Sequence, residues 1–119
     1  MCMIDTGDGT WQYYNTGIRT AKKVHRCGEC YREIQPKEKY HWHSGLWEGR
    51  WGTAKICQHC TVAAEWLQTE CGGFLFTMVD EDLREHFYEG HKNVGRVCVG
   101  IKRQWKKFKS NELMGVPSL

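Results

Sequence analysis

Two short cysteine pairs, Cys27-Gly28-Glu29-Cys30 and Cys57-Gln58-His59-Cys60, decide how this chain folds. A gap of two residues lets both sulfurs of a pair face one ion, because the turn between them brings the thiolates to neighbouring corners of a tetrahedron. Two such pairs supply four sulfur ligands, a set typical of structural zinc. The sequence therefore predicts one structural zinc ion with four cysteine ligands. These ligands are Cys27, Cys30, Cys57 and Cys60.

The segment between the two pairs is typical of a β-hairpin. Residues 39–47 and 50–56 are rich in aromatic and β-branched side chains, and Glu48-Gly49 supplies a glycine for a two-residue turn. Such a turn pairs Trp47 with Arg50, and a bulge at Gly45 or Gly52 would shift this register. One face of the hairpin then carries Tyr40, Trp42, Leu46, Trp51 and Cys57. The opposite face carries His41, His43 and Trp47.

Three helices are expected after the hairpin. The first follows the second cysteine pair, because apolar positions recur with helical spacing from Cys60 to Cys71 and Gly72-Gly73 ends the run. The second begins near Asp80, in an acidic stretch that suits a helix N-terminus. The third covers residues 93–109, where an apolar stripe includes Cys98 and Trp105. Residues 1–20 hold no clear signal beyond the aromatic residues at 11–14.

These elements together predict an α+β fold. A cysteine knuckle, a β-hairpin and a helix that brings the last two ligands describe a treble-clef-like zinc finger, here with two additional C-terminal helices. The whole chain of 119 residues is expected to form a single domain. Its zinc-finger core would comprise residues 22–72, and the helical extension residues 78–110. Cys71 and Cys98 are expected to pack as small apolar side chains rather than bind metal.

The motifs around the cysteines resemble those of a family of small zinc-finger proteins encoded by bacterial viruses and prophages. They are a basic lead-in at residues 22–26, Ile34-x-x-x-Glu38-x-Tyr40, Gly45-x-Trp47-x-Gly49-x-Trp51 and the second cysteine pair. The resemblance covers about residues 20–72 and, more loosely, residues 105–117. It implies a metal-binding role for the four paired cysteines and a phage or prophage origin. Most members of that family have no assigned activity, so the resemblance implies no substrate.

An enzyme is not the expected function. Four thiolates leave a zinc ion no position for water, so it cannot act as a Lewis acid or generate hydroxide. His41, His43 and His59 invite comparison with treble-clef nucleases, but the Asp-His pair and the helix-start Asn of those sites are missing. A dithiol redox enzyme would need one such cysteine pair in a βαβ unit. We predict no catalytic residues and no small-molecule substrate.

The composition of the chain indicates its cellular compartment and its net charge. No apolar run approaches the roughly 20 residues of a membrane helix, and the start of the chain lacks the layout of a signal peptide. We therefore expect a cytoplasmic protein, in the host cell if it is phage-encoded, with reduced cysteines and no membrane contact. The formal net charge is +3. A zinc ion with four thiolates would lower it by two units, so net charge does not favour a nucleic-acid partner.

Two kinds of partner fit the sequence. Aromatic residues and arginine at the hairpin tip favour stoichiometric binding to a host or phage protein of transcription, replication or defence, as an inhibitor. The alternative is a nucleic-acid-binding zinc finger that uses the basic last helix. Each surface also has an explanation without a partner: the aromatic side chains could be buried beneath the helices, and the basic residues could simply face solvent. The candidate residues are Trp47, Arg50 and Trp51 at the tip, and Lys102, Arg103, Lys106 and Lys107 on the last helix.

Overall fold

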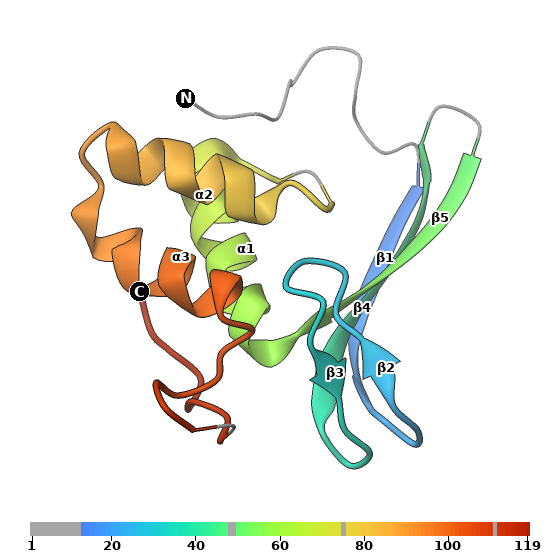
Figure 1. The fold of residues 1–119 in the computed structure, drawn as a ribbon. Coiled ribbons are helices and arrows are strands. Elements are labelled where there is room, and N and C mark those ends of the chain that lie inside the picture. Colours follow the sequence, from blue (N-terminus) through green and yellow to red (C-terminus); the bar gives the residue numbers. More distant parts are fainter. Residues whose placement is uncertain (1–12, 48–49, 75, 111) are drawn as a thin grey trace.

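The computed structural model describes residues 13–47, 50–74, 76–110 and 112–119, and of residues 13, 14 and 47 it describes the backbone alone. The fold is mixed α/β, with a three-stranded antiparallel sheet beside a helical part (Figure 1). The strands are β1 (Tyr13–Thr20), β2 (His25–Arg26), β3 (Glu33–Ile34), β4 (Lys39–Trp47) and β5 (Arg50–Cys57). The helices are α1 (Gln58–Cys71), α2 (Val79–Tyr88), the 3-10 turn η1 (Lys92–Val94) and α3 (Gly95–Lys102).

The predicted hairpin is confirmed with its register. Trp47 pairs with Arg50 and Tyr40 with Cys57, without a shift at the Gly45–Gly52 pair. The turn itself, Glu48-Gly49, lies outside the described residues. What the sequence did not reveal is β1, which pairs with β4 along its full length and makes β4 the central strand. Its polar composition gave no alternation from which to predict a strand.

The two faces of the sheet are covered by different segments. On the face that carries Tyr40, the knuckle approaches from β2, since the rings of His25 and Tyr40 lie 5.1 Å apart. On the opposite face, His43 contacts Phe74 and Phe76, with ring centroids 6.1 and 5.2 Å away. Helix α1 also packs on β4 and β5. The segment that follows α1 therefore returns to cover the middle of the sheet.

The burial of His43 in this packing makes the stability of the protein depend on pH. The side chain is buried, its Nδ1 lies 3.2 Å from Thr16 Oγ1, and burial followed by the neighbouring His41 lowers its pKa to about 4. Because the unfolded chain binds this proton near pH 6.5, the contribution of His43 to stability is complete above that pH and falls as the pH drops towards 4. We expect a loss of about 1.4 kcal/mol at one pH unit below the unfolded-state pKa. Urea unfolding between pH 7.5 and 5.5 measures it. The buried Glu29, whose pKa is raised to about 7, also titrates in this range, so the share of His43 is the difference in pH dependence between the wild-type protein and a His43 variant.

The control for this prediction is on the same strand. His43→Gln should flatten the pH dependence over that range, whereas His41→Gln, two residues away on the same face, removes an imidazole and should leave most of the dependence. Equal slopes for the wild-type protein and His43→Gln would contradict the prediction.

The first two helices follow the sequence prediction, and the third does not. Helix α1 has Cys57 as its N-cap and ends at Gly72 with a left-handed backbone, φ 78°. Helix α2 begins at Val79, with Asp80, Glu81 and Asp82 in its first turn. The prediction of a helix over residues 93–109 is wrong at its end, because α3 stops at Lys102. None of the described helices is both long enough and apolar enough to cross a membrane.

The early end of α3 has a local cause. Gln104 and Trp105 have positive φ angles of 54° and 62°, and the Trp105 amide donates to the Gly100 carbonyl at 2.7 Å. This reversal drives the Trp105 indole back into the protein, where it is fully buried. Burial of a large aromatic side chain offsets the cost of the left-handed backbone. The basic residues predicted on the helix therefore lie mostly on a loop.

Candidate metal centre

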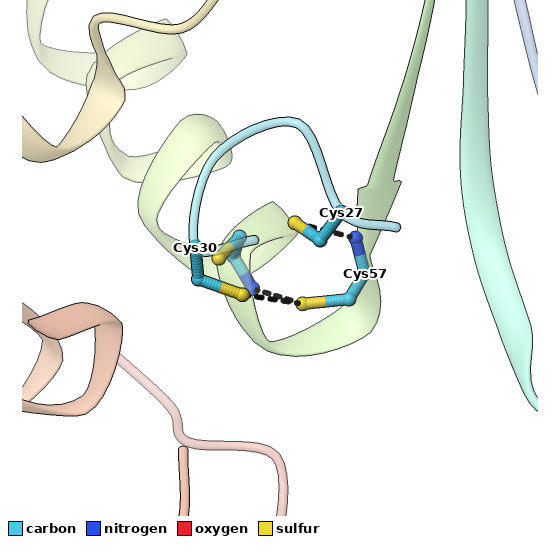
Figure 2. A group of neighbouring side chains, drawn as sticks. Cys27, Cys30 and Cys57 are labelled. Atoms are coloured by element: carbon cyan, nitrogen blue, oxygen red, sulfur yellow. Dashed lines mark hydrogen bonds between the residues drawn. The ribbon is translucent and has the colours of Figure 1, made fainter. Parts of the chain in front are cut away.

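The four predicted ligands come together at the junction of sheet, knuckle and helix. Cys27 and Cys30 lie on the turn between β2 and β3, and Cys57 ends β5 (Figure 2). Cys60 is in the first turn of α1. Their four sulfurs all lie within 4.8 Å of one another. The side chains are buried, with at most 4% of Cys30 exposed. This is a group that can hold a metal ion.

The distances fit a tetrahedral thiolate site. Metal–sulfur bonds of about 2.3 Å give a tetrahedron with edges of roughly 3.8 Å. The Sγ atoms of Cys30 and Cys57 are 3.9 Å apart, and all four cysteines are free. A disulfide would need about 2.05 Å, so this spacing suits ligands around an ion.

Backbone amides support the sulfurs. The amides of Glu29 and Cys57 each donate to Cys27 Sγ at 3.4 Å, and the Cys60 amide donates to Cys57 Sγ at 3.5 Å. The Gly28 amide bonds the Lys55 carbonyl at 2.8 Å, which fixes the knuckle to β5. Amides that point at sulfur stabilise its anionic form. The local fold thus favours the deprotonated forms of Cys27 and Cys57.

The four thiols shift one another's pKa values in opposite directions. Hydrogen bonding from Cys30 lowers the pKa of Cys27, and hydrogen bonding from Cys27 lowers the pKa of Cys57. Hydrogen bonding with Cys27 raises the pKa of Cys30 and of Cys60. Two thiols thus become stronger acids at the expense of the other two. All four can ionise together only around a positive ion.

A buried arginine adds positive charge beside the cluster. Arg32 is 5% exposed and forms an ion pair with Glu38. Burial opposes the charged form of Arg32, but its hydrogen bond to Glu38 and the field of Cys57 raise its pKa. Its Nη2 also lies 3.4 Å from Nδ1 of His59. Arg32 therefore places a buried positive charge beside the thiols.

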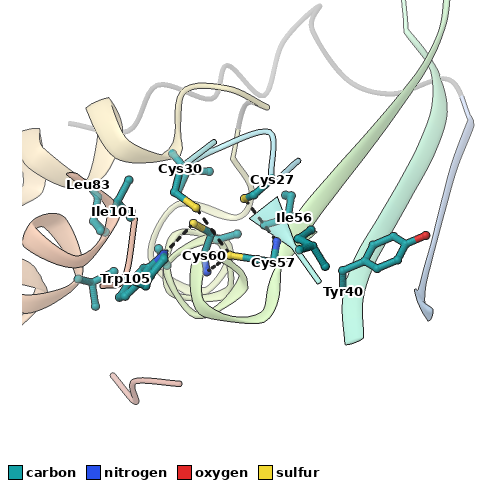
Figure 3. Close-up of a cluster of buried hydrophobic side chains, with 14 of the residues drawn as sticks. Cys27, Cys30, Tyr40, Ile56, Cys57, Cys60, Leu83, Ile101 and Trp105 are labelled. Atoms are coloured by element: carbon teal, nitrogen blue, oxygen red, sulfur yellow. Dashed lines mark hydrogen bonds between the residues drawn. The ribbon is translucent and has the colours of Figure 1, made fainter. Parts of the chain in front are cut away.

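Trp105 is a residue of the site that the sequence analysis missed. Its indole Nε1–H donates to Cys60 Sγ at 3.3 Å from the helical side of the cluster (Figure 3). His59, one of the histidines that invited comparison with nucleases, has its Nε2 against the Met114 carbonyl. These contacts join the C-terminal segment to Cys60 and to the neighbouring His59, across 45 and 55 residues of chain. No local pattern could predict them.

Glu29, inside the first cysteine pair, joins the cluster to the helical extension. Its carboxylate accepts hydrogen bonds from the amides of Thr77 at 2.7 Å and Val79 at 3.2 Å, at the start of α2. Burial raises its pKa to about 7, against the effect of these two amides. The knuckle and α2 are therefore connected through one buried side chain.

The predicted partner-binding residues form two separate groups. Arg50 and Trp51 are exposed at the far end of β5, and the side chain of Trp47 is outside the described part. Lys102 ends α3, and Arg103, Lys106 and Lys107 follow on the loop. Figure 1 shows the end of the sheet and this loop on opposite sides of the molecule. Cys71 and Cys98 are outside the cysteine cluster and pack, partly buried, against the core. Cys98 is a free thiol, but Cys71 is disulfide-bonded, so the expectation of reduced cysteines is wrong for Cys71.

Among the described residues, the four cysteines are the one group of side chains placed so that they could hold a metal ion. Its ligands come from two segments about 30 residues apart in the sequence, joined by a hairpin of confirmed register. No protein-family model, no curated protein and no solved structure matches this chain.

Proposed function

We propose that the four cysteines hold one structural Zn²⁺ ion in a treble-clef-like finger. The donor set and the sulfur spacing support zinc. With four protein thiolates the ion would have no open position for water or substrate, which supports a protein without catalytic activity. The residues that hold the ion would connect the knuckle, β5 and α1, so its role would be to stabilise the fold.

We propose further that the protein acts by stoichiometric binding to another protein. The observation that carries this proposal is the exposed end of the sheet, where Trp51 is 65% exposed beside the exposed Arg50. Tryptophan and arginine are the residues most often found as hot spots of protein interfaces. Tyr40 is buried and Trp42 is half-buried, with the Arg19 guanidinium 4.1 Å from its ring. The candidate surface is therefore the end of the ribbon and not its whole face.

The resemblance to phage and prophage zinc-finger proteins supports a choice of partner. A small non-catalytic protein of such origin would act in the cytoplasm of the host cell, on a host or phage protein of transcription, replication or defence. Inhibition is the effect that we propose, because a binder without an active site changes a partner by occupying its surface.

The test is affinity capture from the native host lysate followed by a binding titration. Replacing Arg50 and Trp51 by alanine should weaken binding of a captured protein at least 30-fold, since two hot-spot residues each contribute about 1 to 2 kcal/mol or more. Zinc content should stay at one ion per chain. Capture that survives nuclease treatment supports a direct protein contact.

A matched control is available on α2. Tyr88 is 78% exposed and lies away from the end of the sheet, so Tyr88→Ala should bind like the wild-type protein. Capture that disappears with nuclease, or equal losses for Tyr88→Ala and the double variant, would count against the proposal.

A further inference from the structure

The loop after α3 concentrates positive charge on one open concave surface. Its hollow of about 480 Å³ is lined by Arg103, Lys106, Lys107, Lys109 and Ser110. The nearest acid in the sequence is Glu112, whose carboxylate pairs with Lys107 at 3.3 Å. Four cationic side chains and one hydroxyl around a hollow match a ligand with several negative charges. We refer to residues 103–110 as the basic loop.

An exposed aromatic ring stands among these cations. Phe108 is 72% exposed, with the Arg103 guanidinium 4.9 Å and the Lys109 Nζ 5.6 Å from its ring centroid. An inorganic anion has no aromatic surface that could stack on this ring. A single-stranded nucleic acid uses both features, because its phosphates pair with the cations and its unpaired bases stack on the ring. The bases of a duplex are already stacked on each other and cannot do so.

The basic loop is held in place at both ends. Its base is closed by a bridge between Lys106 and Leu113, and the Lys107 amide donates to the Glu112 carbonyl at 2.8 Å. Trp105 anchors the loop to the cysteine cluster, and its carbonyl accepts from the Met114 amide at 2.7 Å. Figure 1 shows the segment projecting from the helical side of the molecule. A loop ordered in advance loses less entropy on binding.

We propose that the basic loop binds single-stranded nucleic acid, with Phe108 as the stacking platform and Arg103, Lys106, Lys107 and Lys109 as phosphate contacts. This function is separate from the protein contact proposed for the end of the sheet. It also differs from recognition by a basic helix, since these side chains follow the end of α3.

Fluorescence anisotropy of the zinc-loaded full chain with labelled oligonucleotides of about 15 nucleotides tests the proposal. With four phosphate contacts, the logarithm of affinity should fall with the logarithm of salt at a slope of about −2.8, which is roughly a 50-fold loss between about 50 and 200 mM salt. The double substitution Lys106→Gln and Lys107→Gln should reduce the slope by about 1.4. The same change at the exposed Lys22 and Lys23, before β2, removes equal charge and should leave binding within about threefold.

The stacking component is tested by Phe108→Ala. It should weaken binding of the single strand about 5- to 160-fold, as expected for a base stacked on an aromatic ring, without changing the salt slope. Circular dichroism and melting confirm that each variant is folded. An unchanged affinity in Phe108→Ala, equal affinity for duplex and single strand, equally effective competition by polyglutamate, or no binding at low salt would each overturn the proposal.

Discussion

Removal of the metal from the four cysteines is expected to unfold this protein. A structural zinc site contributes about 10 kcal/mol or more to folding, and small domains retain about 5 to 15 kcal/mol in total. Here the four cysteines join three elements, and one of them, Cys57, is the N-cap of α1. Without the ion, the positive charge that the described residues place beside the buried thiols is that of Arg32, which already pairs with Glu38 and cannot balance four thiolates. We expect a strong chelator to abolish the near-UV circular dichroism and the cooperative melting transition.

The matched substitution is Cys60→Ser against Cys98→Ser. Cys60 is fully buried in the cluster, whereas Cys98 lies on α3, outside it. Cys60→Ser should lose bound zinc, measured by mass spectrometry of the metal, together with its melting transition. Cys98→Ser should keep one zinc per chain and a melting temperature within a few degrees of the wild-type value. An apo protein with an unchanged spectrum and melting point would contradict a structural role for the metal.

The parts of the fold that the sequence predicted are those fixed by local chemistry. A two-residue gap sets the geometry of each cysteine pair, and a two-residue turn sets the register from Trp47–Arg50 to Tyr40–Cys57. The acidic start of α2 and the glycine after α1 are likewise local signals. Each of these features depends on residues close together in the chain.

What could not be predicted depends on contacts between distant segments. Strand β1 exists because the edge of β4 offers it eight partners, although its own composition is polar. Helix α3 ends where the chain reverses to bury the ring of Trp105 beside the cysteine cluster. There the indole N–H donates a hydrogen bond to Cys60 Sγ. On the helical pattern alone, Trp105 belongs to the apolar stripe and the helix continues. The same residue instead turns the chain, and the basic residues beyond it are placed on a loop.

Substitution of Gly100 by alanine is expected to destabilise the protein by about 3 kcal/mol, although alanine is the better helix former. A Cβ atom at this position would lie 2.2 Å from Cζ3 and 2.4 Å from Cε3 of Trp105. The indole cannot move aside cheaply, because it is fully buried and its N–H is bonded to Cys60 Sγ. The added methyl group must therefore displace the ring, with a cost near the upper end of that for overpacking a core.

The cause can be isolated with a double-mutant cycle measured by urea unfolding of the zinc-loaded protein. Trp105→Ala alone should cost about 3 to 5 kcal/mol through lost packing. In that background the space is open, so Gly100→Ala should be neutral or stabilise by up to about 1 kcal/mol through helix propensity. The coupling between the two sites should therefore be about 3 kcal/mol or more. Gly52→Ala, where a Cβ meets no atom within 4 Å, serves as the control and should change stability by less than about 0.5 kcal/mol.

The variant Trp105→Phe distinguishes the contribution of the hydrogen bond to Cys60 Sγ from that of packing, because it keeps an aromatic ring and removes the N–H. A bond to a charged acceptor contributes about 1.5 to 3 kcal/mol, so this variant should lose less stability than Trp105→Ala. In the cobalt-substituted protein its sulfur-to-metal absorption should also shift, because one thiolate loses a donor. Additive costs of Gly100→Ala and Trp105→Ala, or an unshifted cobalt spectrum in Trp105→Phe, would show that Trp105 does not connect the end of α3 to the metal centre.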